Sequence, residues 1–279
     1  MEIGIGLPTT IRGATREQLL EWARRADAAG FSTLGTIDRL VYPNYEPLIA
    51  LAGAAAVTER IRLTTSVLLA PLRTNATLFA KQAASLQALS NGRLVLGVAV
   101  GARPDDFEAS GVPLEGRGRR LTEMLEEIKR VWADGMSPDV SDNPPTLVVG
   151  GTVDAAFRRA AKYADGWIAG GGPPEYFAEG RDKVRAAFTD AGRAEPPRTM
   201  SLSYFSLDDD PEAQVRATIG HYYGFLGDYA DQIVAGAAKG DEAIRERVRA
   251  FDAAECDELI LCPASADPEQ VDRLAAVVL

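Results

Sequence analysis

The sequence predicts a (β/α)8 barrel, the TIM-barrel fold, for a chain of 279 residues. Short apolar runs alternate along the chain with amphipathic stretches, a pattern typical of parallel strands joined by helices. Eight strand–helix units can be counted, and eight units at this length fit one closed barrel, whereas an open doubly wound sheet gives no reason for that number. We therefore expect residues 1–279 to form one α/β barrel domain.

The expected strands are short and rich in apolar and β-branched residues. In chain order they are Glu2–Leu7, Ser32–Ile37, Ile61–Leu68, Arg93–Val100, Thr146–Val149, Gly166–Ala169, Thr199–Leu207 and Asp257–Cys262. A Pro- and Ser-containing stretch, Ser137–Pro145, resembles a linker but is too short to separate two domains.

The expected helices alternate with these strands and carry apolar residues at spacings of three and four. Thr15 and Gln18 have the spacing of a capping box, and Gly30 stands where a helix should end. Asp210 and Asp267 each precede a proline, which is typical of a helix start. The helices are Thr15–Ala29, Pro47–Val57, Thr77–Leu89, Gly118–Trp132, Asp154–Tyr163, Glu175–Ala191, one that starts at Pro211, and Glu269–Val278.

The composition disfavours several classes of function. Hydrophobic residues make up 46% and charged residues 25%, and no run approaches the ~20 apolar residues of a membrane span. With 30 Lys and Arg against 40 Asp and Glu, the net charge of −10 disfavours nucleic acid and anionic membranes as partners. Cys256 and Cys262 cannot build a disulfide framework, so we expect buried, reduced thiols and a cytoplasmic location. A single histidine, His221, cannot anchor a histidine-rich metal site.

Candidate site residues follow from the fold, because the functional site of such a barrel lies at the carboxyl ends of its strands. Glycines there can simply permit tight turns, but a pair and a triplet after two successive strands also suit a phosphate bound by backbone N–H groups. Asp38-Arg39 can orient a ligand or, equally, tie its loop down as a structural ion pair. The candidates are Leu7, Asp38, Arg39, Ser66, Val67, Gly101, Arg103, Gly150, Gly151, Gly170 and Gly171.

Other polar residues have simpler interpretations. Asp105-Asp106 is typical of a helix start, and the acidic run 208–210 is typical of a solvated loop and helix cap. His221 falls in an expected helix, where a surface or core residue is commoner than a catalyst. Gly4-Ile5-Gly6 lacks the third glycine of a dinucleotide fingerprint, and no serine lies in a nucleophile turn.

An ordered set of segments carries a resemblance to a known family. The segments are Gly30-Phe31, Asp38-Arg39, Arg60–Val67, Asn91–Val98, Gly118–Leu121, Val149–Gly151 and Ala164–Ile168. Through them the chain resembles the luciferase-like monooxygenase superfamily from Gly4 to Trp167, and more weakly beyond. Members of that superfamily are (β/α)8 barrels that use FMN or the deazaflavin coenzyme F420.

The resemblance implies an oxidoreductase that transfers hydride to or from a small organic substrate, or that activates oxygen with reduced flavin. It implies a bulge at Ser66-Val67, often built on a cis peptide, that presses on one face of the flavin ring. Asp38-Arg39 would lie near the reacting end of that ring. The residues expected to contact the cofactor are Leu7, Gly101, Arg103 and, at its phosphate, Gly150, Gly151, Gly170 and Gly171.

Three departures from the family bear on the mechanism. Arg39 stands where the family often has histidine, and since a guanidinium cannot donate a proton near neutral pH, we expect Arg39 to clamp an anion with Asp38 orienting it. Ala102 and Pro173 stand where the sugar-phosphate dehydrogenase branch has glutamate and lysine, which disfavours that activity. The stretch 133–145 is short, so we expect part of the cover over the barrel mouth to be missing, leaving an open site or one closed by another subunit.

Two alternatives stay open. A barrel without the usual histidine could bind flavin without catalysis, and an unrelated isomerase or aldolase barrel could bind phosphate but would need a base at the strand ends. Ser66-Val67 followed by Asn75 resembles the deazaflavin branch, whereas the net charge disfavours its polyglutamate tail, so FMN and F420 both remain candidates. The expected partners are a small-molecule substrate and further copies of the chain, as a homodimer or higher homo-oligomer.

Overall fold

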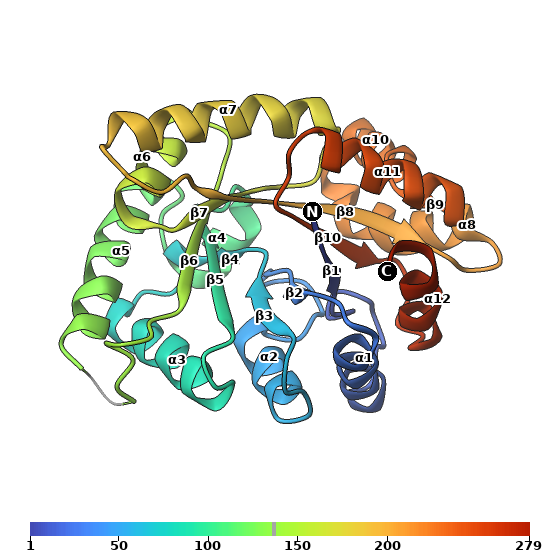
Figure 1. Cartoon of the computed structure of the whole chain (residues 1–279), viewed down its shortest axis with the longest axis horizontal. Coiled ribbons are helices and arrows are strands. Elements are labelled where there is room, and N and C mark those ends of the chain that lie inside the picture. The colour runs from blue at the N-terminus through green and yellow to red at the C-terminus, as the bar shows by residue number, and fades with distance from the viewer. Residues whose placement is uncertain (136–137) are drawn as a thin grey trace.

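A computed structural model describes residues 1–135 and 138–279 of the chain. Its main strands are β1 (Glu2–Gly6), β2 (Thr33–Thr36), β3 (Arg62–Thr65), β5 (Leu94–Ala99), β6 (Thr146–Gly150), β7 (Gly166–Ala169), β8 (Arg198–Ser206) and β10 (Glu258–Pro263). They pair in parallel in this order, and β10 pairs with both β8 and β1, so the ring closes. The predicted (β/α)8 barrel is confirmed, with its helices arranged around the strands (Figure 1).

Seven of the eight helices described on the outside of the barrel lie close to the predicted positions, whereas the helix Asp241–Ala253 was not predicted. The eight are α1 (Arg16–Ala29), α2 (Pro47–Ala55), α3 (Ala76–Leu89), α5 (Arg117–Ala133), α6 (Asp154–Tyr163), α7 (Pro174–Asp190), α11 (Asp241–Ala253) and α12 (Glu269–Val278). Thr15 and Gln18 form the predicted capping box of α1, and Gly30 ends it with a φ of 104°. Asp210 and Asp267 accept hydrogen bonds from Ala213 N and Glu269 N, as expected of helix-start carboxylates.

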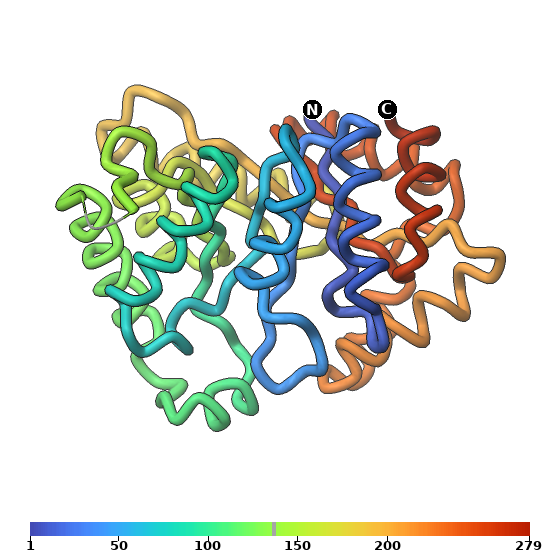
Figure 2. Tube along the Cα trace, turned by 90° about the horizontal axis from the view of Figure 1, so that it is seen from below, coloured from blue at the N-terminus to red at the C-terminus, as the bar shows by residue number. Residues whose placement is uncertain are grey.

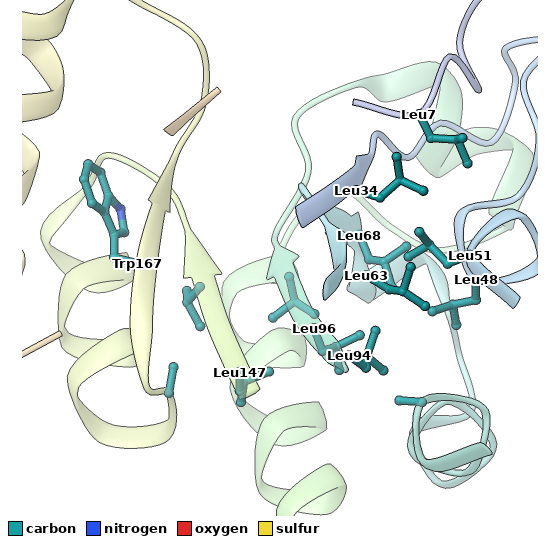
Figure 3. Packing of buried hydrophobic residues seen from close by; sticks show 14 of the residues in the cluster. Leu7, Leu34, Leu48, Leu51, Leu63, Leu68, Leu94, Leu96, Leu147 and Trp167 are labelled. Atoms are coloured by element: carbon teal, nitrogen blue, oxygen red, sulfur yellow. The ribbon is translucent and has the colours of Figure 1, made fainter. Parts of the chain in front are cut away.

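Two apolar layers hold the barrel together. Strand residues such as Leu34, Leu63 and Leu96 point outward and pack against the helices, including Leu48 and Leu51 of α2 (Figure 3). The inner layer contains Val95, Val148, Met200 and Ile260, which fill the barrel itself. Strand residues therefore alternate between the interior and the helices, which is why the strands read as nearly continuous apolar runs.

A buried ion-pair cluster joins strands at the amino-terminal end of the barrel. Glu258 is fully buried at the start of β10, where it accepts hydrogen bonds from Ser32 Oγ at 2.5 Å and Arg198 Nη2 at 2.8 Å. Arg62 Nη2 donates to the same carboxylate at 3.0 Å. The cluster links β10 with β3 and β8 on the side of the barrel opposite the mouth.

The chain departs from a plain alternation at three places. The third strand is interrupted at Ser66-Val67, whose peptide bond is cis, before it resumes as β4 (Leu68–Leu69) and the 3₁₀ turn η1 (Ala70–Leu72). A short helix, α4 (Pro104–Ser110), follows β5. The sequence predicted one helix after β8, but the structure has a run of short turns there. They are α8 (Pro211–Val215), the π-helical turn η2 (Arg216–Gly220), α9 (His221–Tyr223), the 3₁₀ turn η3 (Gly224–Leu226), α10 (Asp228–Ala235) and β9 (Ala238–Lys239).

The two ends of the barrel differ sharply. Both termini lie at one end, and the loops after β2, β5 and β8 project from the other, where they appear in blue, green and orange (Figure 2). That second end is the mouth, formed by the carboxyl ends of the strands. Residues 211–237 cover it, because Val215, Ile219 and Val234 pack onto the inner apolar layer.

The expectation about residues 133–145 is wrong. The linker-like stretch starts at Ser137, which lies outside the described residues, but its described part packs at the amino-terminal end of the barrel, where Gln87 Nε2 donates to Asn143 O at 3.0 Å. A chain leaving a helix returns to the amino-terminal edge of a parallel sheet, so this segment cannot cover the mouth. Its shortness therefore leaves nothing uncovered there.

Candidate functional site

Asp38 anchors the loop after β2 to the interrupted third strand. Its side chain is buried and accepts a hydrogen bond from Leu69 N at 2.8 Å. Arg73 Nη1 donates to the same oxygen at 2.7 Å, and Arg73 Nη2 reaches Glu46 at 2.9 Å. Burial opposes the charge of Arg73, but the two carboxylates prevail and raise the pKa of its guanidinium. Asp38 thus fixes the backbone just after Ser66-Val67.

Arg39 belongs to a different ion pair. Its Nε donates to Asp106 at 2.7 Å and its Nη2 to Asp105 at 3.2 Å. Asp106 is fully buried and also accepts from Leu40 N and Val41 N, each at 3.0 Å. The expectation that Asp38 orients Arg39 is therefore wrong, because each side chain has its own opposite charge. Asp105-Asp106 does lie in the first turn of α4, but it also holds Arg39 in place.

Two guanidinium N–H groups at the mouth lack partners. Among the described residues, Nη1 of Arg39 and Nη1 of Arg103 are buried and make no hydrogen bond. Arg103 also pairs with Asp105, and its guanidinium carbon lies 3.4 Å from the centre of the Phe225 ring. Buried donors are nearly always satisfied, so two unpaired cationic donors at one opening suit an anionic group bound there.

Aromatic residues from the segment after β8 lie over these cations. We call Tyr222, Tyr223 and Phe225 the aromatic cover. The guanidinium carbon of Arg39 lies 5.6 Å from the Tyr222 ring centre and 6.0 Å from that of Phe225. Tyr222 and Tyr223 meet edge to face, and a guanidinium is attracted to ring faces. The cover therefore helps to shield the Arg39 guanidinium from water, since this residue is buried.

The cover also brings hydroxyl groups together. Tyr223 shares a 2.7 Å hydrogen bond with Tyr204 of β8, and burial raises the pKa of Tyr223 to about 12. Burial likewise raises the pKa of Tyr204. The hydroxyl of Tyr42 lies 3.0 Å from Nδ1 of His221, which is an exposed residue on α9. Together with Tyr222, the described residues thus bring four phenols and the imidazole of His221 to the mouth, and burial raises the pKa of each phenol.

Val67 follows the cis peptide bond and packs against the inner apolar layer. Ser66 is held by Thr36 O, which accepts from its N at 2.7 Å and its Oγ at 3.1 Å. A Cβ on Gly150 would lie 3.5 Å from Val67 Cγ1, so these two residues are neighbours across the mouth. The structure therefore brings the end of β3 and the end of β6 close together.

The remaining candidates fall in three places. Gly101 has a φ of 73° and its carbonyl accepts from Arg117 Nε at 3.0 Å. Gly151 has a φ of 133°, and a Cβ there would come within 2.8 Å of the Ala156 side chain. Leu7 directly follows the carboxyl end of β1 and is buried in the outer apolar layer.

A pocket of about 380 Å³ opens beside the cover, at the end of β7. We call it the glycine pocket, because the Gly170–Gly172 loop forms one wall. A Cβ on Gly170 would meet nothing within 4 Å, so that position faces open space. Gly150 and Gly151 do not line this pocket. Its polar lining comes from Thr152, Ser201, Lys183, Glu179, Tyr176 and Tyr229.

The described residues contain neither a metal-binding cluster nor a reactive thiol. No group of three His, Cys, Asp or Glu side chains there could hold a metal ion. Cys256 and Cys262 are buried and free, and burial raises the pKa of each thiol to about 12. The prediction that both cysteines are buried is confirmed. Within the same residues, no helix has both the length and the apolar character needed to cross a bilayer.

Sequence reasoning found the strand ends but missed the cover. His221, Tyr222 and Tyr223 were expected only as part of a helix, and nothing pointed to their place over Arg39. The cluster of aromatic residues and glycines at 220–227 was the available signal, because glycine-rich breaks in a helix often mark segments that fold over a site.

Comparison with known proteins agrees with this architecture. A family model described as luciferase-like monooxygenase matches residues 1–273. The F420-dependent glucose-6-phosphate dehydrogenase of Kribbella flavida is 30% identical over 252 residues, covering 78% of this chain and 73% of the relative.

Two solved structures share the fold. An F420-dependent secondary alcohol dehydrogenase, in complex with an F420–acetone adduct, superposes with a TM-score of 0.84 at 16% identity, covering 99% of this chain and 98% of the other. The oxygenating constituent of 3,6-diketocamphane monooxygenase from Pseudomonas putida, in complex with FMN, gives 0.71 at 17% identity, covering 94% and 91%. Together with the matching family model, the closed barrel and its cation-lined mouth lead to one conclusion: the chain belongs to the luciferase-like monooxygenase family.

Proposed function

We propose that this chain is an oxidoreductase that binds FMN or F420 at the barrel mouth and acts on a small organic substrate. The observation that carries the proposal is the pair of buried, unpaired Nη1 groups of Arg39 and Arg103 beneath the aromatic cover. Both cofactors are anionic. A buried guanidinium whose N–H groups are not all paired with carboxylates is suited to binding an anion. When bound, such a cofactor supplies hydride exchange or, as reduced flavin, oxygen activation.

The glycine pocket would hold the cofactor phosphate. Backbone N–H groups of Gly170–Gly172 and the hydroxyls of Thr152 and Ser201 are hydrogen-bond donors on its wall, and Lys183 adds a positive charge. Val67 and Gly150 would form the surface against which the ring packs. Gly150, Gly151 and Gly101 would act by leaving room and by shaping the strand ends rather than by contacting the phosphate.

Some of the site residues would bind an anion through their charge, and others would hold the backbone of the site in position. Arg39 would clamp an anionic group of cofactor or substrate, held in place by Asp106. Asp38 would act as a positioning residue, since it fixes the backbone next to the Ser66-Val67 bulge. The Tyr204–Tyr223 pair holds protons at the mouth, and the aromatic cover excludes water. Leu7 would support the barrel wall.

Two finer points belong to the same proposal. Ala102 and Pro173 depart from the sugar-phosphate dehydrogenase pattern, which supports a different small organic substrate. Ile49, Leu78 and Leu89 are exposed and line one groove between α2 and α3, and an apolar patch of this kind supports a homo-oligomer. Light scattering on the purified protein would measure the assembly, and a mass near 29.8 kDa would contradict it.

Titration of the purified protein with FMN and with F420, followed by fluorescence, tests the proposal. We expect binding of at least one cofactor with a dissociation constant of about 10 µM or tighter. Substrate-dependent oxidation of the bound, reduced cofactor would then separate an enzyme from a barrel that only binds. If neither cofactor binds at about 50 µM, the proposed function is wrong.

A further inference from the structure

A groove between α6 and α7 is lined by more cations than carboxylates. It encloses about 640 Å³ on the outside of the barrel, where the two helices are neighbours (Figure 1). We call it the basic groove, because Arg158, Lys162, Lys183 and Arg193 line it together with only two carboxylates, Asp154 and Asp190. This excess is notable in a chain whose net charge is −10.

Most cations of the basic groove make no ion pair with another described residue. Among the described residues, Arg158 and Lys183 are exposed and make no hydrogen bond or ion pair. Arg193 Nη1 donates to the carbonyls of Ala161 at 3.0 Å and Ala164 at 2.9 Å, so it is held in place without a carboxylate. Lys162 lies 3.6 Å from a carboxylate, Oε1 of Glu126, and its side chain is 68% exposed.

The basic groove is continuous with the glycine pocket. Lys183 and Phe157 line both hollows, and Phe157 is buried against Trp167 beneath them. A chain that starts from a phosphate in the glycine pocket would therefore pass Lys183 and reach Arg158 and Lys162 along the surface. A row of several positive charges attracts an extended polyanion more strongly than it attracts a single small anion.

We infer that the basic groove binds an anionic chain attached to the cofactor, namely the oligoglutamate tail of F420. This inference rests on the proposed function and narrows it, because FMN ends at its phosphate and leaves the basic groove without an occupant. The net charge of the whole chain disfavours such a tail, but the local charge at α6 and α7 has the opposite sign. Local charge governs binding because exposed charges more than about 10 Å apart are screened at 0.1 M salt.

The contribution of the tail should be modest and dependent on salt. Exposed ion pairs are weak, so we expect each cation to improve affinity by about threefold and two of them by about tenfold. The screening length falls from about 10 Å at 0.1 M to about 3 Å at 1 M salt, so the advantage of the tail should nearly vanish at 1 M NaCl.

The test compares F420 bearing a glutamate tail with the same cofactor lacking glutamates, by fluorescence titration at 0.1 M and 1 M NaCl. The groove variant combines Arg158→Gln with Lys162→Gln, which leaves Lys183 and the glycine pocket intact. The control combines Arg24→Gln with Lys129→Gln, which removes one arginine and one lysine on α1 and α5, outside the basic groove. All four positions are on exposed helix surfaces, where glutamine is well tolerated.

We expect the groove variant to lose about tenfold in affinity for the tailed cofactor at 0.1 M NaCl, with the tailless form unchanged and the control unaffected. Equal affinity of the unaltered protein for both forms would overturn the inference, and so would equal loss of both forms in the groove variant. If the tailless form or FMN binds while the tail adds nothing, only this inference fails. If no cofactor binds at all, the proposed function fails with it.

Discussion

Arg39 has two roles that mutation can separate. It is a buried cation, and its removal leaves the fully buried carboxylate of Asp106 without a positively charged partner. It also carries one of the unpaired N–H donors at the mouth. Arg103 carries the other, but its partner Asp105 is 42% exposed and can be solvated when the arginine is lost. The two arginines therefore form a matched pair in which only the first is essential to the fold.

We predict that Arg39→Ala lowers the free energy of unfolding by about 3–5 kcal/mol, because an unpaired buried carboxylate is costly. Arg103→Ala should lower it by less than about 1 kcal/mol. Urea denaturation of both variants measures this difference. Equal stabilities would show that Asp106 does not depend on Arg39.

At the residue scale, the sequence predicted which residues lie at the mouth but not which residues they pair with. Asp38 and Arg39 were found because strand ends in a barrel point at the mouth. Their partners, Arg73 and Asp106, lie 35 and 67 positions further along the chain. Spacing rules act within one element, so they cannot reveal a contact between the loops of different strands.

Among the elements, α1 shows how one carboxylate joins a helix to the next strand. Asp27 accepts backbone hydrogen bonds from Glu59 at 2.9 Å, Arg60 at 3.1 Å and Ile61 at 2.7 Å. Burial by itself would raise the pKa of Asp27, but the three N–H donors outweigh it and hold the pKa below its usual value. The ionised carboxylate thus ties α1 to the start of β3.

We predict that Asp27→Asn destabilises the protein by about 1–2 kcal/mol at pH 7. Because the pKa is lower in the folded state, the carboxylate contributes fully above the unfolded value of about 3.9 and loses its contribution as the pH falls through the lower folded value. The stability difference between the two proteins should therefore be constant from about pH 7 to 5 and shrink toward about pH 3. A difference that does not depend on pH would show that the charge of Asp27 is unimportant.

The elements with a clear hydrophobic period were predicted well, whereas the aromatic cover was not predicted. All eight strands and seven of the described outer helices lie within three residues of their expected ends, because each has an apolar face of constant period, whereas α11 was not predicted. The segment 211–235 is broken by Gly220, Gly224 and Gly227 into short turns with different periods. No single hydrophobic period describes this segment. Its packing depends on contacts with the barrel below, and these cannot be predicted from the local sequence pattern.

For the whole molecule, the closed sheet supports the proposal that residues 1–279 act as one domain. Trp22, Trp132 and Trp167 lie in α1, α5 and β7, and all three are buried in one apolar cluster. We predict a single cooperative unfolding transition, with tryptophan fluorescence and far-ultraviolet circular dichroism changing together in urea. Two separate transitions would contradict a single domain.

Charge is also organised over the whole molecule. The net charge of −10 hides two local concentrations of cations, at the mouth around Arg39 and Arg103 and on the outer surface in the basic groove. Composition could not locate them, because it averages over the surface. We propose that the cofactor runs from the first concentration, beneath the aromatic cover, through the glycine pocket to the second.

The most direct test of that path is cofactor binding by a Gly170→Val variant. A Cβ at Gly170 would meet no protein atom within 4 Å, so the variant should fold normally while adding bulk to the wall of the glycine pocket. Gly53→Ala on α2, where a Cβ has only an ordinary 3.7 Å contact, is the matched control. In fluorescence titrations we expect Gly170→Val to weaken binding of FMN or F420 by about 100-fold or more, a loss of about 2.7 kcal/mol, with Gly53→Ala unchanged. Unchanged affinity in a folded Gly170→Val protein would contradict the account.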